Sequence, residues 1–179
     1  MATTLTTLRD RVETILADAS NELWSTTDLD EAIRRALHAY SASNPRRRIT
    51  TLTLAADGRE ISTASIPDII TVEDLWLPYD ADNPQSPINR RAFRFWKDSA
   101  ILYVLSQYLP QSGDVARIFY AALHTLNGLD SASETTIPDE HTSTIALGAA
   151  GYAAASRAID LSEQVSIDRQ VTDRLTIWA

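Results

Sequence analysis

The hydrophobic pattern of the chain changes its period at Asn44-Pro45, and this change constrains the fold more than any other feature. Before this point apolar residues recur every three or four positions, which is the spacing of one helical face. The first series is Leu5, Leu8, Val12, Ile15 and Ala19, and the second is Leu29, Ile33, Ala36, Leu37 and Tyr40. A residue before proline avoids the helical region, so the second series ends there. The pattern predicts helices over residues 4–18 and 27–43.

Residues 46–123 form a segment rich in β-branched and aromatic side chains, which favour strands. A strand over 49–56 is apolar or β-branched on both faces, so we expect it to be covered on both sides. Asp57-Gly58 predicts a hairpin turn with a return strand over 59–63. Further strands are expected over 69–77 and 115–123. Segments 92–96 and 101–105 flank Lys97-Asp98-Ser99 and indicate a second hairpin, with a helix over 93–108 as the alternative.

Pro138-Asp139-Glu140 opens a third predicted helix, over residues 139–162, because proline and acidic residues suit a first turn. Its many small residues, Gly148 and Gly151 among them, let another helix approach closely, so we expect contacts between subunits there. Residues 165–179 follow as an amphipathic arm. The predicted class is α+β: a core over 1–164, with two N-terminal helices, a long C-terminal helix and an inserted β-rich hairpin region, followed by the arm.

The charge balance argues against a general nucleic-acid binder. The chain has 16 basic and 24 acidic residues, a net charge of −8, whereas such a binder must neutralise phosphates. Cysteine is absent, so we expect no disulfide or thiolate chemistry. No run of about 18 apolar residues predicts a membrane span, and the N-terminal sequence does not resemble a signal peptide.

Candidate catalytic groups all have ordinary structural explanations. No pair among His38, His124 and His141 has the i, i+4 spacing of a helical zinc site. Acidic residues from Asp28 to Glu31 match the start of a helix, where the helix dipole favours anions. No serine lies in a Gly-x-Ser-x-Gly motif. We therefore predict a protein that is not an enzyme, with no catalytic, metal or cofactor site.

Two segments are better candidates for interactions. Arg46, Arg47 and Arg48 form the longest basic run, which suits phosphates or, given the net charge, a solvated edge or an acidic neighbouring subunit. The arm places apolar residues on one helical face that ends at a tryptophan, a common interface anchor. Either this face folds back on the core or it docks into a groove on a partner. The candidate docking residues are Ile167, Val171, Arg174, Leu175, Ile177 and Trp178.

The order of motifs resembles that of the phage head-to-tail adaptor, or connector, proteins. A Leu-patterned helix precedes Trp24-Ser25 and an acidic, Ala-containing helix. A basic and polar segment over 48–61, a strand marked by Ile66-Pro67, and an apolar segment ending near His124 follow in the order of that family. Ile137-Pro138 before the Ala-rich helix completes the match.

This resemblance implies a dodecameric ring that links the portal protein to a downstream tail or neck protein. The viral genome passes through the lumen without sequence-specific binding. It also implies a location in the neck of the virion, at the head–tail interface, after assembly in the host cytoplasm, with no membrane partner. In several such adaptors the C-terminal segment engages the portal, so the resemblance suggests that role as a hypothesis for residues 165–179. The alternative is another neck or tail-completion protein, a stopper or a tail terminator.

Overall fold

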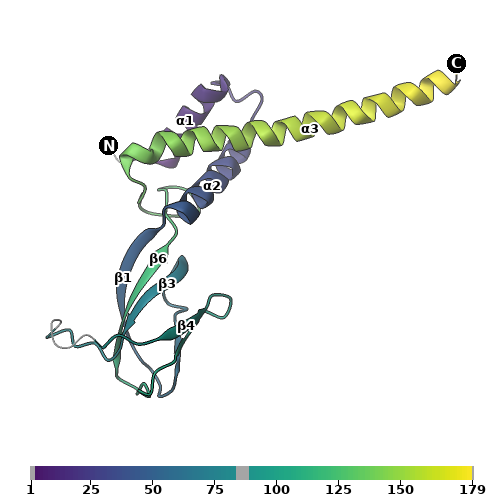
Figure 1. The fold of residues 1–179 in the computed structure, drawn as a ribbon. Helices are drawn as coiled ribbons and strands as arrows, with labels where there is room; N and C mark the ends of the chain where they lie inside the picture. Colours follow the sequence, from purple (N-terminus) through teal and green to yellow (C-terminus); the bar gives the residue numbers. More distant parts are fainter. Residues whose placement is uncertain (1–2, 84–88, 179) are drawn as a thin grey trace. The chain divides into compact units, whose positions relative to one another are not determined.

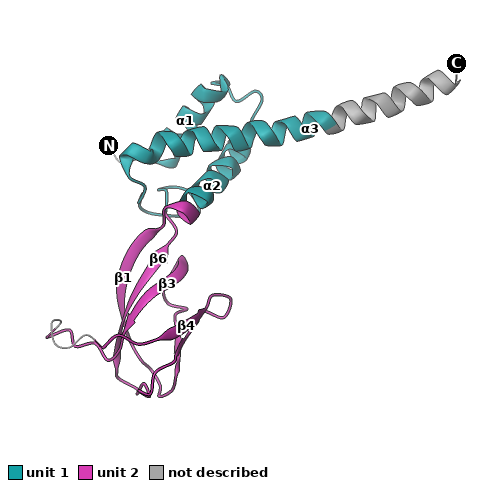
Figure 2. Cartoon of the chain, in the orientation of Figure 1, with its two compact units in different colours: residues 1–40, 125–179 teal, residues 41–124 magenta. Residues whose placement is uncertain are grey.

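The computed structural model describes the backbone of residues 3–83 and 89–178, and the side chains of residues 3–83 and 89–162. The chain forms two compact units (Figure 2): unit 1 comprises residues 1–40 and 125–179, and unit 2 comprises residues 41–124. Unit 1 is helical and unit 2 is built from strands (Figure 1). The predicted α+β class, a helical core with an inserted β-rich region, is confirmed.

Unit 1 contains α1 (Leu5–Leu16), α2 (Thr26–Ser43, whose last residues belong to unit 2), the 3₁₀ turn η1 (Asp139–His141) and α3 (Thr142–Trp178). The helix α2 starts where the acidic residues from Asp28 to Glu31 predict it, and its first turn is capped. The Asp28 amide donates to Ser25 Oγ over 3.2 Å, and the Ser25 amide donates to Asp28 Oδ2 over 3.0 Å. These reciprocal bonds satisfy amides that have no partner within the helix. The acidic residue at this position is therefore a cap.

The core of unit 1 consists of most of the predicted apolar faces of α1 and α2 together with one face of α3. Ile15 and Ala19 were expected on the first face, but both are exposed, and Ala19 lies beyond the end of α1. Leu8, Val12, Leu29 and Ile33 are fully buried, as the helical periodicity indicates. From α3 come Ile145 and a series of alanines, Ala146, Ala149, Ala150 and Ala153. Because these side chains are small, the backbone of α3 packs close to the other two helices.

Unit 2 contains two antiparallel sheets of three strands each. The first has the order β1 (Arg46–Thr53), β6 (Val115–Ala122), β3 (Ile69–Trp76), and the second has the order β2 (Glu60–Ser62), β5 (Ile101–Val104), β4 (Phe93–Trp96). Alternate residues of the central strands are buried, since successive side chains point to opposite faces. These include Ala116, Ile118 and Tyr120 on β6 and Leu102 and Val104 on β5, which share one core.

Two predictions for this region are wrong. Asp57-Gly58 does not join a hairpin, because β1 pairs with β6 over eight residues while β2 pairs with β5. The Gly58 amide instead donates to the Pro110 carbonyl over 2.9 Å. The strand at 49–56 is not covered on both sides either, since Ile49 is 53% exposed. The hairpin around residues 97–99 is confirmed by the pairing of β4 with β5, so the helical alternative is wrong.

Candidate interaction surface on α3

The helix α3 buries one face and exposes another that is equally apolar. Successive helical residues are separated by about 100°, so the buried residues from Ile145 to Ala153 occupy one side. On the opposite side Leu147 is 64% exposed and Ile159 is 60% exposed, and the half-exposed Tyr152 and Leu161 lie at its two edges. Small exposed residues lie between them, namely Gly148, Gly151, Ala154, Ala155 and Ala158. We call these nine residues the α3 face.

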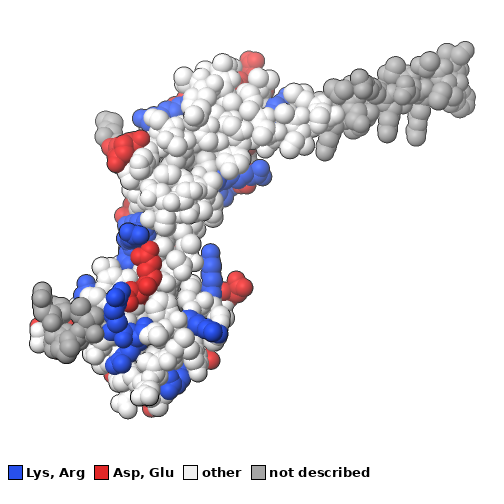
Figure 3. Space-filling model, viewed as in Figure 1, with Lys and Arg blue, Asp and Glu red and all other residues white. Residues whose placement is uncertain are grey.

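The α3 face carries no charge. The charged residues of α3 before residue 163 are Arg157 and Asp160, and both line a groove on the other side of the helix with Trp24 and Arg35. In the view of Figure 3 the described part of α3 is accordingly mostly white. A contiguous exposed apolar patch of this kind marks an interaction site. The α3 face therefore has the character of a surface that a partner covers.

The two glycines predicted to lie between subunits differ in their surroundings. A Cβ added at Gly148 would lie 3.5 Å from the Ala36 Cβ, so this glycine borders α2 within unit 1. A Cβ added at Gly151 would meet nothing within 4 Å. Gly151 is thus open to an approaching helix, and the role of both residues in subunit contacts stays a prediction.

Polar contacts hold the other elements of unit 1 against α3. The Trp24 Nε1 group donates to the Ala153 carbonyl over 3.2 Å. Arg9 forms two bonds to the Asp30 carboxylate, of 2.5 and 2.7 Å, which tie α1 to α2. Two-pronged bonds of this kind fix direction as well as distance. The helix that carries the α3 face is therefore held by polar contacts as well as by the core of unit 1.

A second arginine fork ties α2 to the loop after residue 125. Arg34 Nε and Nη2 donate to the two oxygens of Asp130, and Nη1 donates to Glu31. The bonds from Arg34 hold the pKa of Asp130 below its usual range, and bonds from Arg35 and Arg34 do the same for the pKa of Glu31. These carboxylates stay ionised because they are structural partners of arginines, so their shifted pKa values do not indicate catalysis.

The loop between α1 and α2 is organised by Asp18. Its carboxylate accepts hydrogen bonds from the amides of Glu22, Leu23 and Trp24, at 3.0, 3.0 and 3.1 Å. Burial acts to raise the pKa of Asp18, but the three amide bonds outweigh it and lower the pKa. This charged cap places Trp24 against the helical core.

The three histidines do not form a site. His141 Nδ1 and the Tyr40 hydroxyl are 2.6 Å apart. His124 is buried, its amide donates to Ser41 Oγ and its Nε2 lies 3.1 Å from the Asn44 carbonyl oxygen. Within residues 3–83 and 89–162, no group of three or more His, Asp or Glu residues could hold a metal ion.

Three basic residues of unit 2 have partners within that unit. Arg47 pairs with Glu73 at 3.3 Å, and Arg90 pairs with Asp74 at 2.8 Å. The guanidinium of Arg91 lies 4.7 Å from the centre of the Tyr108 ring. The role predicted for Arg46, Arg47 and Arg48 in contacts between subunits stays a prediction.

The predicted docking residues from Ile167 to Trp178 lie outside the residues whose side chains the structure describes. The backbone of α3 continues through them as a helix. Sequence reasoning singled out this stripe but missed the large exposed side chains of the α3 face. The signal for that face was an Ala-rich helix with apolar residues on every side. In the part of the chain that the structure describes, no helix is long and apolar enough to cross a membrane.

Comparison with known proteins gives weak structural likenesses. No protein-family model and no curated protein matches the chain. A chain in the neck of an empty gene transfer agent (GTA) particle, computed with C6 symmetry, is 19% identical, with a TM-score of 0.37 over 84% of this chain and 77% of that one. A chain in the virion of a native GTA particle is 22% identical, with a TM-score of 0.36 and the same coverage. TM-scores this low do not establish a common fold, so neither likeness assigns a function to this chain.

Proposed function

We propose that the chain is a non-enzymatic structural subunit of the neck of a tailed phage or phage-like particle. Specifically, it is a head-to-tail adaptor that forms a dodecameric ring between the portal and the next tail or neck protein. The observation that carries this proposal is the α3 face, an uncharged apolar surface on a braced helical scaffold. Such a surface suits a permanent assembly, because it offers area to bury and no chemistry.

Two further features support the adaptor role. The motif order from Trp24-Ser25 to Ile137-Pro138 follows that of the adaptor family. The net charge of −8 suits a ring whose lumen does not adhere to passing DNA, because like charges repel. In this role the arm over residues 165–179 docks on the portal through Ile167, Val171, Leu175 and Trp178, and the α3 face, with Gly148 and Gly151, packs against neighbouring copies.

A stopper or tail terminator is the second candidate, because it shares the need for apolar assembly surfaces. The two roles differ in their direct partner and in copy number. An adaptor binds the portal itself and matches its twelvefold ring, whereas components of the tail proper commonly follow sixfold symmetry. Copy number per portal ring therefore separates them.

The test is reconstitution with the portal protein of the same genome. Native mass spectrometry of the purified mixture is expected to show a closed ring of roughly twelve copies added to each portal ring. The same chain should be found by peptide mass spectrometry in purified virions. A chain that ignores the portal and is absent from virions contradicts the proposal, and six copies per particle on a tail protein favour the second candidate.

A further inference from the structure

One face of the first sheet of unit 2 carries a half-buried arginine surrounded by aromatic rings. On β6 the side chains of Ala116, Ile118 and Tyr120 are in the core, so those of Arg117 and Phe119 lie on the opposite face. The strand register places Thr51 and Trp76 beside Arg117, and Ile49 and Asp74 beside Phe119. We call this surface, together with Tyr79, the Arg117 face.

Arg117 is held by rings and has no acidic partner. Its guanidinium carbon lies 4.8 Å from the centre of the Tyr79 ring, 5.5 Å from Trp76 and 5.6 Å from Phe119. Nη1 donates to the Tyr79 hydroxyl over 2.6 Å. The buried Nε has no hydrogen-bond partner, and no carboxylate lies within ion-pair distance among the described residues. Stacking on the rings stabilises and orients the guanidinium. Its hydrogen-bonding groups are only partly used, and no anion neutralises its charge among the described residues.

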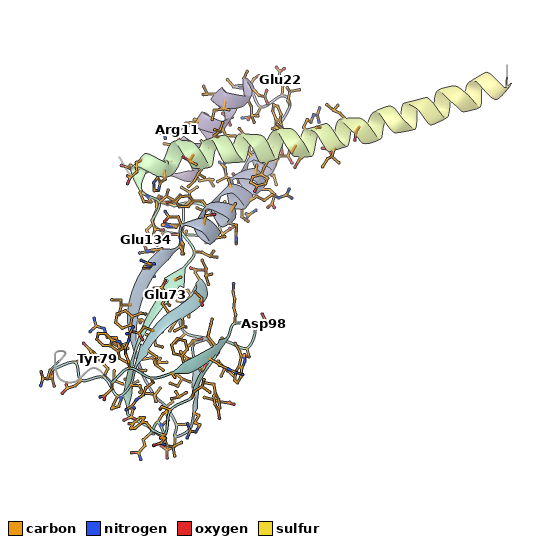
Figure 4. The ribbon with its side chains drawn as sticks, viewed as in Figure 1. Arg11, Glu22, Glu73, Tyr79, Asp98 and Glu134 are labelled. Carbon is orange, nitrogen blue, oxygen red and sulfur yellow. The ribbon has the colours of Figure 1, made fainter. Side chains whose placement is uncertain are left out.

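The other cations near this face already have carboxylates. Arg90 Nε lies 2.8 Å from Asp74 Oδ2, which also accepts from Trp76 Nε1. Arg47 pairs with Glu73 of β3; Figure 4 labels Glu73 and Tyr79. Among the arginines named on this face, Arg117 is therefore the one without a carboxylate. A nucleic-acid backbone releases counterions only where several uncompensated cations meet its phosphates, so this face suits one carboxylate of a protein partner. Arginine, tryptophan and tyrosine are also the side chains enriched at the centre of protein interfaces.

The chain itself carries the complementary charge. Unit 2 contains nine basic and nine acidic residues, whereas unit 1 contains seven basic and fifteen acidic residues, so the whole net charge of −8 lies in unit 1. In the view of Figure 3, blue and red atoms adjoin one another over unit 2. On unit 1, Asp10, Glu22, Asp139 and Glu140 are exposed and have no ion-pair partner in the described part of the chain.

We propose that the Arg117 face binds the acidic surface of unit 1 of a second copy of this chain. One carboxylate of that copy completes the Arg117 guanidinium, and its surroundings cover Ile49 and Trp76. Such a pair is strong because the rings hold the guanidinium in one orientation before the partner arrives. The contact rests on the proposed role as a subunit of a ring, and it adds which surfaces of neighbouring copies meet.

Photocrosslinking tests which surface covers this face. A benzoylphenylalanine replaces Ile49, which is 53% exposed and lies outside the ring cluster that holds Arg117. The full chain is prepared in isotopically light and heavy forms, mixed at high concentration and irradiated. We expect crosslinks of mixed isotope composition from position 49 to residues 1–40 or 125–179. Crosslinks within one copy, crosslinks to unit 2, or no crosslinks overturn the proposal.

Charge reversal supplies a second, independent measurement. Arg117→Glu should raise the dissociation constant for the association of copies, measured by sedimentation velocity, at least about tenfold. Arg94→Glu is the control, because it makes the same charge change at an exposed position of β4 in the other sheet. Equal loss in both variants, or no loss in Arg117→Glu, contradicts the proposed contact.

Arg117 is packed among rings, so its replacement also changes the packing of unit 2. A second variant is therefore needed that alters the same surface and leaves this packing unchanged. Ile49→Glu leaves the ring cluster intact and places a negative charge opposite the acidic surface of the second copy. Leu105→Glu is its control, because Leu105 is also half exposed and directly follows β5. Association should fall for Ile49→Glu alone. Duplex DNA that binds wild type but not Arg117→Glu would assign the face to nucleic acid instead. Portal binding is measured separately. If the wild-type chain does not bind the portal, the adaptor role is contradicted. If the Ile49→Glu variant still forms normal rings on the portal, only this contact is contradicted.

Discussion

Replacing Leu147 and Ile159 together by glutamine should disrupt assembly without destabilising the subunit. Complete burial of such a side chain contributes about 1.5–3 kcal/mol. Leu147 is 64% exposed and Ile159 is 60% exposed, so a partner that covers both gains roughly 1–2 kcal/mol from each. The pair amounts to about 2–4 kcal/mol, a factor of roughly thirty to a thousand in the dissociation constant. Glutamine keeps part of the hydrocarbon stem, so we expect the lower end, about thirtyfold.

The assay titrates the double variant against portal rings and counts bound copies by native mass spectrometry. Its matched control replaces Ile15 and Leu23, which are 47% and 52% exposed on the same unit but lie outside α3. Both double variants should keep the free energy of unfolding within about 0.5 kcal/mol per substitution, because exposed positions carry little packing energy. Wild-type assembly by the α3 variant, or equal loss in both, would refute the assignment of this face to a partner.

Three further predictions concern the units, a cap and the arm. Leu8→Ala and Leu102→Ala, both at fully buried positions, should each cost about 2–5 kcal/mol; hydrogen exchange should show the faster opening confined to unit 1 and unit 2 respectively, and one uniform loss would contradict separate cores. The pKa of Asp18 is lowered in the folded chain, so its charge stabilises the fold above its ordinary pKa, roughly 4, and this contribution is lost as pH falls below that value. Urea unfolding should therefore show the advantage of wild type over Asp18→Asn shrinking in acid, and a gap independent of pH would exclude this origin. Deletion of residues 165–179 should abolish portal binding while circular dichroism stays that of a folded chain; lost folding would show that the arm belongs to the core.

Local patterns were sufficient to locate the helices and most strands. The periodicity of α1 and α2 and the cap at Ser25 and Asp28 act within a few residues, so the sequence displays them directly. Strand pairing is different, because β1 meets a partner some seventy residues further along the chain. Asp57-Gly58 has the composition of a hairpin turn, but the three-residue β2 offers β1 less pairing than the eight-residue β6. Long-range pairing overrode the local turn signal.

Two surface features could be found in the sequence only in part. The segment that forms the α3 face has apolar residues on both its buried and its exposed side, so its periodicity does not indicate which side is buried. Arg117 stands alone as a charged residue in the strand Val115–Ala122, and such a placement is a usable signal. The rings around it come from β3, from Tyr79 and from β6 itself, and only the fold brings them together.

The proposed contact between the Arg117 face and unit 1 has a consequence for symmetry. It joins two different surfaces, so two copies can make it reciprocally as a twofold dimer, or each copy can make it with the next as a heterologous contact. In the heterologous form each copy uses its Arg117 face to bind one neighbour and the acidic surface of its unit 1 to bind the other. Repetition of such a contact gives a ring where the rotation closes and a filament where it does not. The proposed ring on the portal requires the heterologous form, in which the portal acts as a template that selects the closing rotation.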